Sequence, residues 1–222
     1  MHSSVEKLKL ISTKVNDLIN TKQLKTEPNI IVVTKMFSMS SIVPLLESGH
    51  IHYGENKVKE AEEKWSGSRN KYKNLQLHMV GKLQTNKAKK AVEIFDYIHS
   101  LDNERLASKI SQYQKELNKN IKLFIQVNVG DEEQKSGIGI DNLKDFYEFC
   151  VKKLSLNIIG LMCLPPINKN PNKYFLSLRD HALSLNLNHL SMGMSADFES
   201  AIINESTFIR IGTAVLGERK FT

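Results

Sequence analysis

One lysine of this 222-residue sequence stands where an amine could do covalent chemistry. Lys35 directly follows the β-branched run at residues 30–34, which is typical of a strand buried on both faces. Its stem would leave that strand in a dry environment, where the ammonium form is disfavoured and the amine is prepared to attack an aldehyde. A lysine that merely extends from the strand end into solvent is the alternative, and this feature alone favours it.

Two glycine-rich segments late in the sequence have the composition of a phosphate-binding loop. They are LSMGMS at residues 190–195 and RIGTAVLG at residues 210–217. Glycines let backbone N–H groups approach an anion, and the hydroxyls of Ser195 and Thr213 can donate further hydrogen bonds. No GxGxxG or Walker A pattern occurs, which disfavours a dinucleotide or P-loop site. A flexible glycine turn is the competing interpretation.

An alternation of short β-branched runs and longer amphipathic stretches must position these residues. Eight runs are predicted to be strands: residues 29–35, 50–54, 75–81, 97–100, 122–129, 157–162, 189–192 and 208–212. Helices are expected between them, with Asp102 and Asp141 as N-caps of two. Repeated strand–helix–strand units favour a parallel sheet, and this number of units matches a closed (β/α)8 barrel. An open doubly wound sheet is the structural alternative.

The sequence predicts a single α/β domain. We expect a TIM barrel over residues 1–222, with an N-terminal helix at about residues 4–20 and the barrel at about residues 30–219. Function is then expected at the C-terminal ends of the strands. The polar residues predicted to meet there are Thr34, Lys35, Glu55, Asn56, His78, residues 84–87, Ser100, Asn128, residues 191–195 and residues 210–213.

The net charge of +7 raises the question of a nucleic-acid partner. The excess is mostly lysine spread along the chain, without the stripe of arginines and aromatics that nucleic-acid modules use. The densest run, NKAKKA at residues 86–91, is interpreted as a solvated helix face. We therefore expect no nucleic-acid partner.

Composition also bears on compartment and metal binding. No apolar stretch is long enough to span a membrane, and the N-terminus lacks the apolar core of a secretory signal. Cys150 and Cys163 form no CxxC pair, so neither a disulfide framework nor a zinc site is expected, and both thiols are predicted to be buried and inert. These features predict a cytoplasmic protein without a membrane partner or metal.

Several ordered blocks together resemble one family, the pyridoxal phosphate (PLP) homeostasis proteins. They are VVTK (32–35), HYGENKVKEA (52–61), HMVGKLQTNK (78–87), QVNVGDEEQKSG (126–137), GLMCLPP (160–166), LSMGMSADFESAI (190–202) and RIGTAVLGER (210–219). The likeness runs from about Ile30 to Arg219. It implies PLP as the ligand. It also implies a fold-type III barrel, similar to that of alanine racemase and eukaryotic ornithine decarboxylases, but without their C-terminal β domain.

The resemblance also implies the roles of individual residues. Lys35 matches the lysine that holds PLP as an internal aldimine, and Arg210 matches the arginine facing the pyridine nitrogen. Ser195, Gly212 and Thr213 match positions around the phosphate. Asn56 and Met194 match residues lining the ring pocket. His78 belongs to a family block without an assigned role. The departures, Lys57 for arginine and Leu77-His78-Met79 for Trp-His-Phe, touch neither the lysine nor the phosphate positions.

Two functions then compete: a carrier of PLP in vitamin B6 homeostasis and a PLP-dependent racemase or decarboxylase. The chain ends at Thr222, ten residues after the expected last strand, so no second wall over the cofactor is expected. A permanently charged Arg210 would disfavour protonation of the ring and weaken it as an electron sink, although alanine racemase tolerates the same arrangement. No second base with an evident partner is found.

The carrier interpretation is therefore favoured. We expect no catalytic residues, a monomer, and apo PLP-dependent enzymes as recipients of the cofactor. A barrel enzyme acting on a sugar phosphate is a third hypothesis, which a colourless preparation without a reducible adduct would favour.

Overall fold

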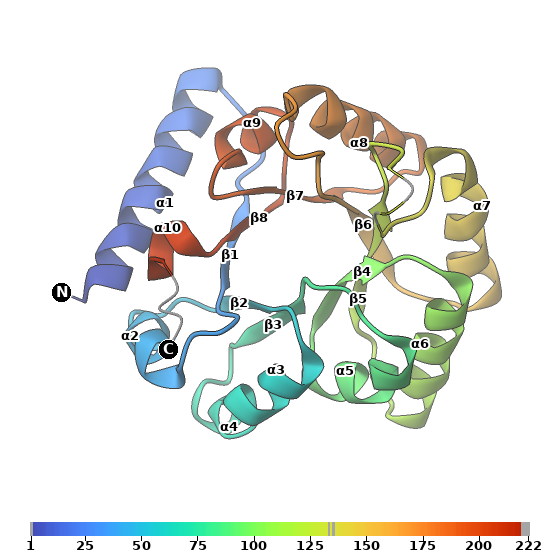
Figure 1. Cartoon of the computed structure of the whole chain (residues 1–222), viewed down its shortest axis with the longest axis horizontal. Coiled ribbons are helices and arrows are strands. Elements are labelled where there is room, and N and C mark those ends of the chain that lie inside the picture. Colours follow the sequence, from blue (N-terminus) through green and yellow to red (C-terminus); the bar gives the residue numbers. More distant parts are fainter. Residues whose placement is uncertain (1, 133, 135, 219–222) are drawn as a thin grey trace.

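The computed structural model describes residues 2–132, 134 and 136–218, so the predicted barrel end at Arg219 and the terminal Thr222 lie outside the described residues. Within the described part, eight parallel strands close into a barrel in the order of the sequence (Figure 1). This confirms the (β/α)8 barrel and excludes the open sheet. The strands are β1 (Asn29–Val33), β2 (His52–Glu55), β3 (Gln76–Met79), β4 (Tyr97–Leu101), β5 (Lys122–Val127), β6 (Ile158–Cys163), β7 (His189–Met194) and β8 (Phe208–Ile211).

Helices surround the barrel on its outer side (Figure 1). The α-helices are α1 (Ser3–Lys22), α2 (Met39–Glu47), α3 (Val58–Trp65), α4 (Ser68–Lys71), α5 (Ala88–Ile94), α6 (Glu104–Glu116), α7 (Leu143–Glu148), α8 (Asn172–Ser184), α9 (Phe198–Ile203) and α10 (Thr213–Leu216). Two 3-10 turns, η1 (Thr85–Lys87) and η2 (Ile140–Asn142), and a π-helical turn, η3 (Phe149–Lys153), adjoin them. None of the described helices is long and apolar enough to cross a membrane.

Closure of the barrel brings the two ends of the sequence together. Strand β1 pairs with β8 in parallel, and Ile31 lies opposite Arg210. The register places the exit of β1, which leads to Lys35, beside the exit of β8, which leads to Gly212 and Thr213. Residues about 180 positions apart in the chain therefore share one corner of the barrel mouth.

The N-terminal helix α1 lies outside the barrel beside α10, as Figure 1 shows. It buries Val5, Leu8, Ile11 and Val15, whose spacing puts them on one helical face. The predicted helix at about residues 4–20 is confirmed. It begins one residue earlier and ends two residues later than predicted. Gln23 closes it in the left-handed conformation, with φ of 53°.

Hydrophobic side chains form two layers of core. The larger layer fills the space between the strands and the helices, and it includes Trp65 and Cys150. A smaller cluster, built on Phe124 and Phe208, lies within the barrel. Both cysteines are free and buried, which confirms the prediction of buried thiols, and burial raises the pKa of each thiol to about 12.

Two predicted helix caps are wrong by one residue or more. The N-cap of α6 is Asn103, whose Oδ1 accepts a hydrogen bond from the Leu106 amide at 2.9 Å, while Asp102 only accepts one from the Asn103 side chain. Asp141 lies inside η2, and Asn142 is the N-cap of α7. In both cases an asparagine next to the predicted aspartate has the backbone position of the cap, and residue type alone does not distinguish the two.

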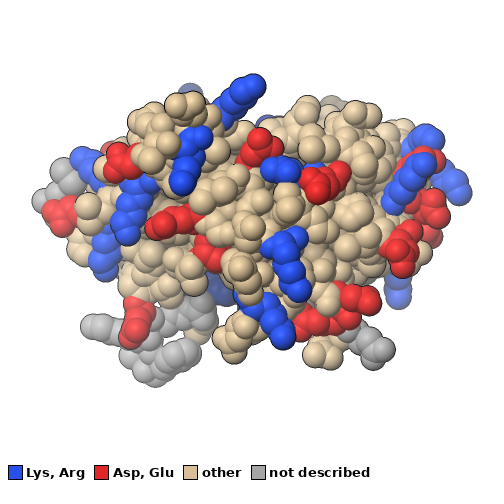
Figure 2. All heavy atoms as spheres, turned by 90° about the horizontal axis from the view of Figure 1, so that it is seen from above, with Lys and Arg blue, Asp and Glu red and all other residues tan. Residues whose placement is uncertain are grey.

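Charges of both signs are mixed over the face drawn in Figure 2. In the predicted solvated run, Lys89 lies within 4.0 Å of Glu116, and Lys90 pairs with Glu62 and Glu93. These exposed pairs agree with a solvated helix face for that part of the run.

Candidate functional site

A pocket of about 360 Å³ opens at the C-terminal mouth of the barrel. It is lined by residues from the ends of strands β1, β2, β3, β6, β7 and β8. The structure brings all seven predicted site residues together there: Lys35, Asn56, Met194, Ser195, Arg210, Gly212 and Thr213. Val33, Phe37, Val80, Leu164 and Ala196 complete the lining. This placement shows that the seven share one site; their roles toward a ligand stay a prediction.

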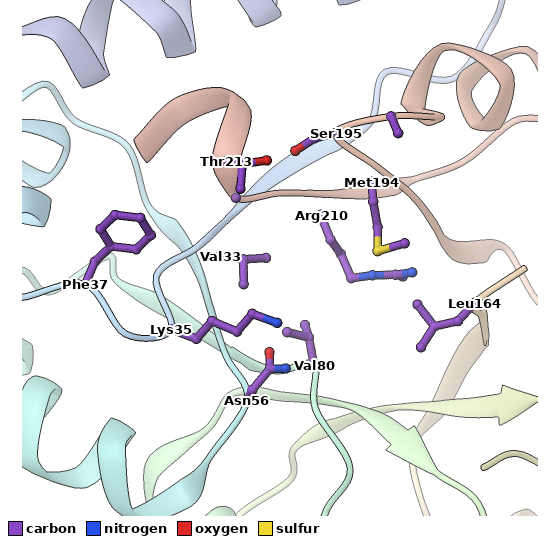
Figure 3. A pocket seen from close by; sticks show the side chains of 12 residues that line it. Val33, Lys35, Phe37, Asn56, Val80, Leu164, Met194, Ser195, Arg210 and Thr213 are labelled. Carbon is purple, nitrogen blue, oxygen red and sulfur yellow. The ribbon is translucent and has the colours of Figure 1, made fainter. Parts of the chain in front are cut away.

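Lys35 lies in the turn after β1, two residues beyond the strand end at Val33. Its side chain is half-buried and extends into the pocket between Val33 and Val80, as Figure 3 shows. The predicted strand at residues 29–35 therefore ends two residues early. The turn gives the lysine the freedom to point across the mouth instead of along a sheet face.

A buried ion cluster lies behind this turn, and we call Glu55, Lys64 and Glu60 the acid–lysine triad. Lys64 Nζ lies 2.8 Å from both Glu55 Oε1 and Glu60 Oε1, and the Glu55 side chain is 0% exposed. Glu55 Oε1 also accepts hydrogen bonds from Thr34 Oγ1 at 2.7 Å and from Trp65 Nε1 at 3.0 Å. The charge of the carboxylate is thus balanced by Lys64, and its Oε1 atom is hydrogen-bonded without solvent.

The same triad fixes the backbone on both sides of Lys35. Lys64 Nζ donates to the Thr34 carbonyl at 2.8 Å, and the Met36 amide donates to the Glu60 carboxylate. Met36 has a φ of 65°, a left-handed conformation that a methionine adopts only when its surroundings hold it there. The triad therefore determines where the lysine side chain starts.

The opposite side of the pocket is built by the loops after β7 and β8. In Figure 3 the hydroxyls of Ser195 and Thr213 lie near each other above the Lys35 side chain. Gly193, with φ of 91°, lets β7 turn there; a β-carbon at this position would lie 2.5 Å from that of Ala201. The arrangement gives two hydroxyls and glycine-flanked backbone at one end of the pocket, which suits an anion.

Arg210 forms the inner wall of the pocket. Its side chain is buried, with Nη1 donating to Ser191 Oγ at 2.6 Å and to the Ser191 carbonyl at 2.7 Å, and Nη2 donating to the Cys163 carbonyl at 2.9 Å. Burial lowers the pKa of the guanidinium below its usual value, but the group remains protonated. Among the described residues it forms no ion pair, so a fixed positive charge faces the ligand space.

A chain of hydrogen bonds continues from Arg210 through the barrel interior. Ser191 Oγ lies 2.7 Å from His99 Nδ1, His99 Nε2 lies 2.9 Å from His78 Nδ1, and His78 Nε2 lies 3.0 Å from His52 Nδ1. Burial, reinforced by neighbouring charges, lowers the pKa of His78 and His99 well below the usual value. We call these three neutral rings the histidine chain.

The histidine chain changes the interpretation of two predicted mouth residues. His78 and Ser191 lie fully buried in the barrel, and neither lines the pocket. The expectation that they meet at the mouth is wrong, because their side chains point into the barrel core from strands β3 and β7. Of the other expected residues, Asn128 lines a separate hollow, and Gln84 and Lys87 line a third one.

Sequence reasoning missed the acid–lysine triad and the histidine chain. One local signal existed for the triad, since Glu60 and Lys64 are spaced i, i+4 on α3. The histidine chain had none, because its contacts join strands far apart in sequence. The described residues contain no group of three or more His, Cys, Asp or Glu that could hold a metal ion.

Comparisons with known proteins agree with this geometry. The model of the alanine racemase N-terminal domain family matches residues 16–220. The pyridoxal phosphate homeostasis protein of Aquifex aeolicus is 40% identical over 76% of this chain and 77% of its own length, and that of Escherichia coli K12 is 30% identical over 88% of each. PipY of Synechococcus elongatus, solved with PLP bound, has a TM-score of 0.79 and 31% identity over 91% of this chain and 100% of that chain.

Two kinds of match thus point the same way. The family model covers most of the chain, and relatives above 30% identity cover more than two thirds of both partners. The chain belongs to the pyridoxal phosphate homeostasis protein family, whose barrel is that of the alanine racemase N-terminal domain.

Proposed function

We propose that this protein binds pyridoxal 5′-phosphate in the pocket at the barrel mouth and takes part in vitamin B6 homeostasis. The observation that carries the proposal is the placement of an amine, two hydroxyls and a guanidinium around one pocket of about 360 Å³. PLP presents an aldehyde, a phosphate and a pyridine nitrogen, so each part of the cofactor has a matching partner. The names of the homologues and the PLP-bound PipY structure support the same ligand.

Lys35 supplies the covalent anchor in this proposal. Its amine would hold the cofactor through the aldehyde group, on the turn after β1. The acid–lysine triad holds the backbone on both sides of that amine. When bound, PLP supplies an electron-accepting ring. In this proposal the protein later releases the whole cofactor to a recipient protein.

The remaining pocket residues orient the cofactor. Ser195, Gly212 and Thr213 would hold the phosphate through hydroxyl and backbone N–H groups. Arg210 would face the ring nitrogen, and its charge, which forms no ion pair with a described carboxylate, would disfavour a proton there. Asn56 and Met194, which line the same pocket, would flank the ring. Because the pocket residues fit the group, no metal is needed to explain the site.

We further propose that the protein carries the cofactor without turning over a substrate. The ionisable side chains that line the pocket within the described residues are Lys35 and Arg210, so no second acid–base group stands ready for proton transfer. Apo forms of PLP-dependent enzymes are the proposed recipients. We propose a monomer acting in the cytoplasm, in keeping with two free, buried thiols.

The test is an absorbance spectrum followed by borohydride reduction and peptide mass spectrometry. The wild-type protein is expected to be yellow and to carry the reduced cofactor on Lys35. Lys35→Ala should lose the adduct, whereas Lys82→Ala, which removes a lysine beside the pocket, should keep it. An adduct of equal yield on other lysines in Lys35→Ala would refute the site, and amino-acid racemisation at ordinary enzyme rates would refute the carrier role alone.

A further inference from the structure

The hollow that Gln84 and Lys87 line has a volume of about 480 Å³ and shares Asn56 with the cofactor pocket. Four lysines line it: Lys57, Lys59, Lys82 and Lys87. We call this hollow the lysine groove. Gln84 adds an amide, and none of the lining residues is acidic. The groove falls within the HYGENKVKEA and HMVGKLQTNK blocks of the sequence, which the cofactor pocket uses only through Asn56 and Val80.

The acidic residues nearest in sequence offset only part of this charge, through a charge interaction of Glu60 with Lys57 and an ion pair of Glu63 with Lys59. Glu60 is bound to Lys64 and the Met36 amide, on the side of the acid–lysine triad. Glu62 pairs with Lys90 at 3.1 Å. Among the described residues, the one carboxylate in an ion pair with a groove lysine is that of Glu63, at 3.9 Å from Lys59, and this pair is largely exposed and therefore weak.

The other three groove lysines have no ion pair with any described residue. Lys87 differs in this from its neighbours Lys89 and Lys90, which are paired on the surface of α5. Like charges that converge on a hollow repel one another, so the arrangement is unfavourable until an anion enters. A bound anion would remove that repulsion, and this makes the groove a better site than scattered surface lysines.

The start of helix α3 adds to the positive potential of the groove. The helix begins at Val58, and its N-cap, Lys57, makes no side-chain capping hydrogen bond. The acidic side chain of the first turn, Glu60, is directed at Lys64 and Met36. The first amides of α3 therefore lack a side-chain acceptor at the edge of the groove, where Lys57, Val58 and Lys59 form part of the lining.

We propose that the lysine groove binds the phosphate groups of a small ligand, at a site separate from the hydroxyls of Ser195 and Thr213. Phosphate suits lysine because both interact mainly as charges and each phosphate oxygen can accept several donors. The concave shape and a volume of about 480 Å³ suit a small molecule better than a duplex or a flat protein surface. Met79, Leu83 and Val58 provide an apolar floor beneath the charges.

The groove is also in direct contact with the cofactor pocket. Asn56 lines both hollows. The β3 exit runs so close to it that a β-carbon on Gly81 would lie 2.5 Å from the Asn56 carbonyl oxygen. A ligand in the groove therefore touches the segment that forms one wall of the cofactor pocket. The proposal stands without the cofactor, however, because it rests on the groove's own charges.

The test measures binding of pyrophosphate and of adenosine 5′-diphosphate to the purified full-length protein by calorimetry, with the site mapped by amide chemical shifts. A variant with Lys57→Gln, Lys59→Gln, Lys82→Gln and Lys87→Gln removes the groove charge. The matched control replaces four exposed lysines elsewhere, Lys9, Lys14, Lys115 and Lys144, with glutamine, so both variants lose the same net charge.

We expect saturable binding of both probes and shift changes at residues 57–60 and 81–87. The groove variant should weaken binding by about tenfold or more, since each surface charge pair is worth up to a few-fold, and the control variant by less than about twofold. If adenosine 5′-diphosphate binds more tightly than pyrophosphate, the apolar floor of the groove contacts the base. If the two bind equally, the groove recognises the phosphates alone. Equal weakening in both variants, or shifts confined to Ser195, Gly212 and Thr213, would overturn the proposal.

Discussion

Lys64→Met tests whether the acid–lysine triad positions the lysine turn. Methionine keeps the length of the side chain but leaves the Glu55 carboxylate, which is 0% exposed, without a counter-charge. Only Thr34 and Trp65 would remain as donors to Oε1, and Oε2 has no hydrogen-bond partner among the described residues. Removing one partner of a buried ion pair costs about 3–5 kcal/mol, so we expect a loss of that size in the free energy of unfolding.

Chemical denaturation of four variants measures this loss and its origin. Lys64→Met with Glu55→Gln removes both charges, and the double variant should be at least about 2 kcal/mol more stable than the sum of the single changes predicts. Lys59→Met is the control on the same helix, since its side chain is 84% exposed and its pairing distance is 3.9 Å. It should change the free energy of unfolding by less than about 0.5 kcal/mol.

The triad also bears on the cofactor. Lys64→Met removes the hydrogen bond to the Thr34 carbonyl, so the turn that carries Lys35 should lose its fixed start, and PLP should bind more weakly even where the variant is folded. A Lys64→Met protein that loses less than about 1 kcal/mol in the free energy of unfolding and keeps its PLP affinity would refute the reasoning. A buried carboxylate without a counter-charge should destabilise the fold by more than that.

Three further predictions concern other parts of the barrel. Arg210→Met should shift the absorption maximum of bound PLP and weaken its binding by about tenfold, the worth of one charged hydrogen bond, while the adduct on Lys35 persists; an unchanged spectrum would contradict the assigned contact. Burial and nearby positive charge lower the pKa of His52 to about 4, so an unfolded chain binds more protons below pH 6.5 and stability should fall between pH 6.5 and 4. His52→Gln should remove up to about 2 kcal/mol of that loss in denaturation at several pH values, and an identical pH profile would exclude the ring as its source. Gly160→Ala should destabilise the protein by about 3 kcal/mol in the same assay, since the new β-carbon would lie 2.0 Å from the His189 carbonyl oxygen; full stability would show that the two strands can separate freely.

The strands were predictable because their signal is local. Continuous β-branched runs such as that before Lys35 are long enough to identify and too apolar to be exposed, and every predicted run became a strand with shifts of only a few residues at its ends. Helix caps were less certain, because Asp102 and Asn103 are equally good capping residues by type and only the backbone decides between them. The closed barrel was predicted from the number of strand–helix units, and in such a barrel the strands follow one another in sequence order.

The pocket was predictable for a different reason. Its residues came from resemblance to a family, and the structure shows that they converge. Most of the features behind it depend on pairs that no local pattern joins, and the i, i+4 pair of Glu60 and Lys64 is the exception. His99 and Ser191 are 92 positions apart, yet their side chains lie 2.7 Å from each other. Such contacts form only when the barrel closes. Neither the periodicity of hydrophobic residues nor the residue types predict them.

The histidine chain imposes a rule on where hydrogens sit inside the barrel. A neutral imidazole has one N–H and one bare nitrogen, so each ring that gives a hydrogen to one neighbour must take one from the other. The three rings are linked nitrogen to nitrogen, and they can therefore align in only two ways, all reversed together. In one alignment Ser191 must give its hydrogen to His99, and in the other it receives one. The N–H groups of the three rings thus all point toward Ser191 or all point away from it. Arg210, which is bonded to Ser191, therefore experiences one of two electric fields from the barrel interior.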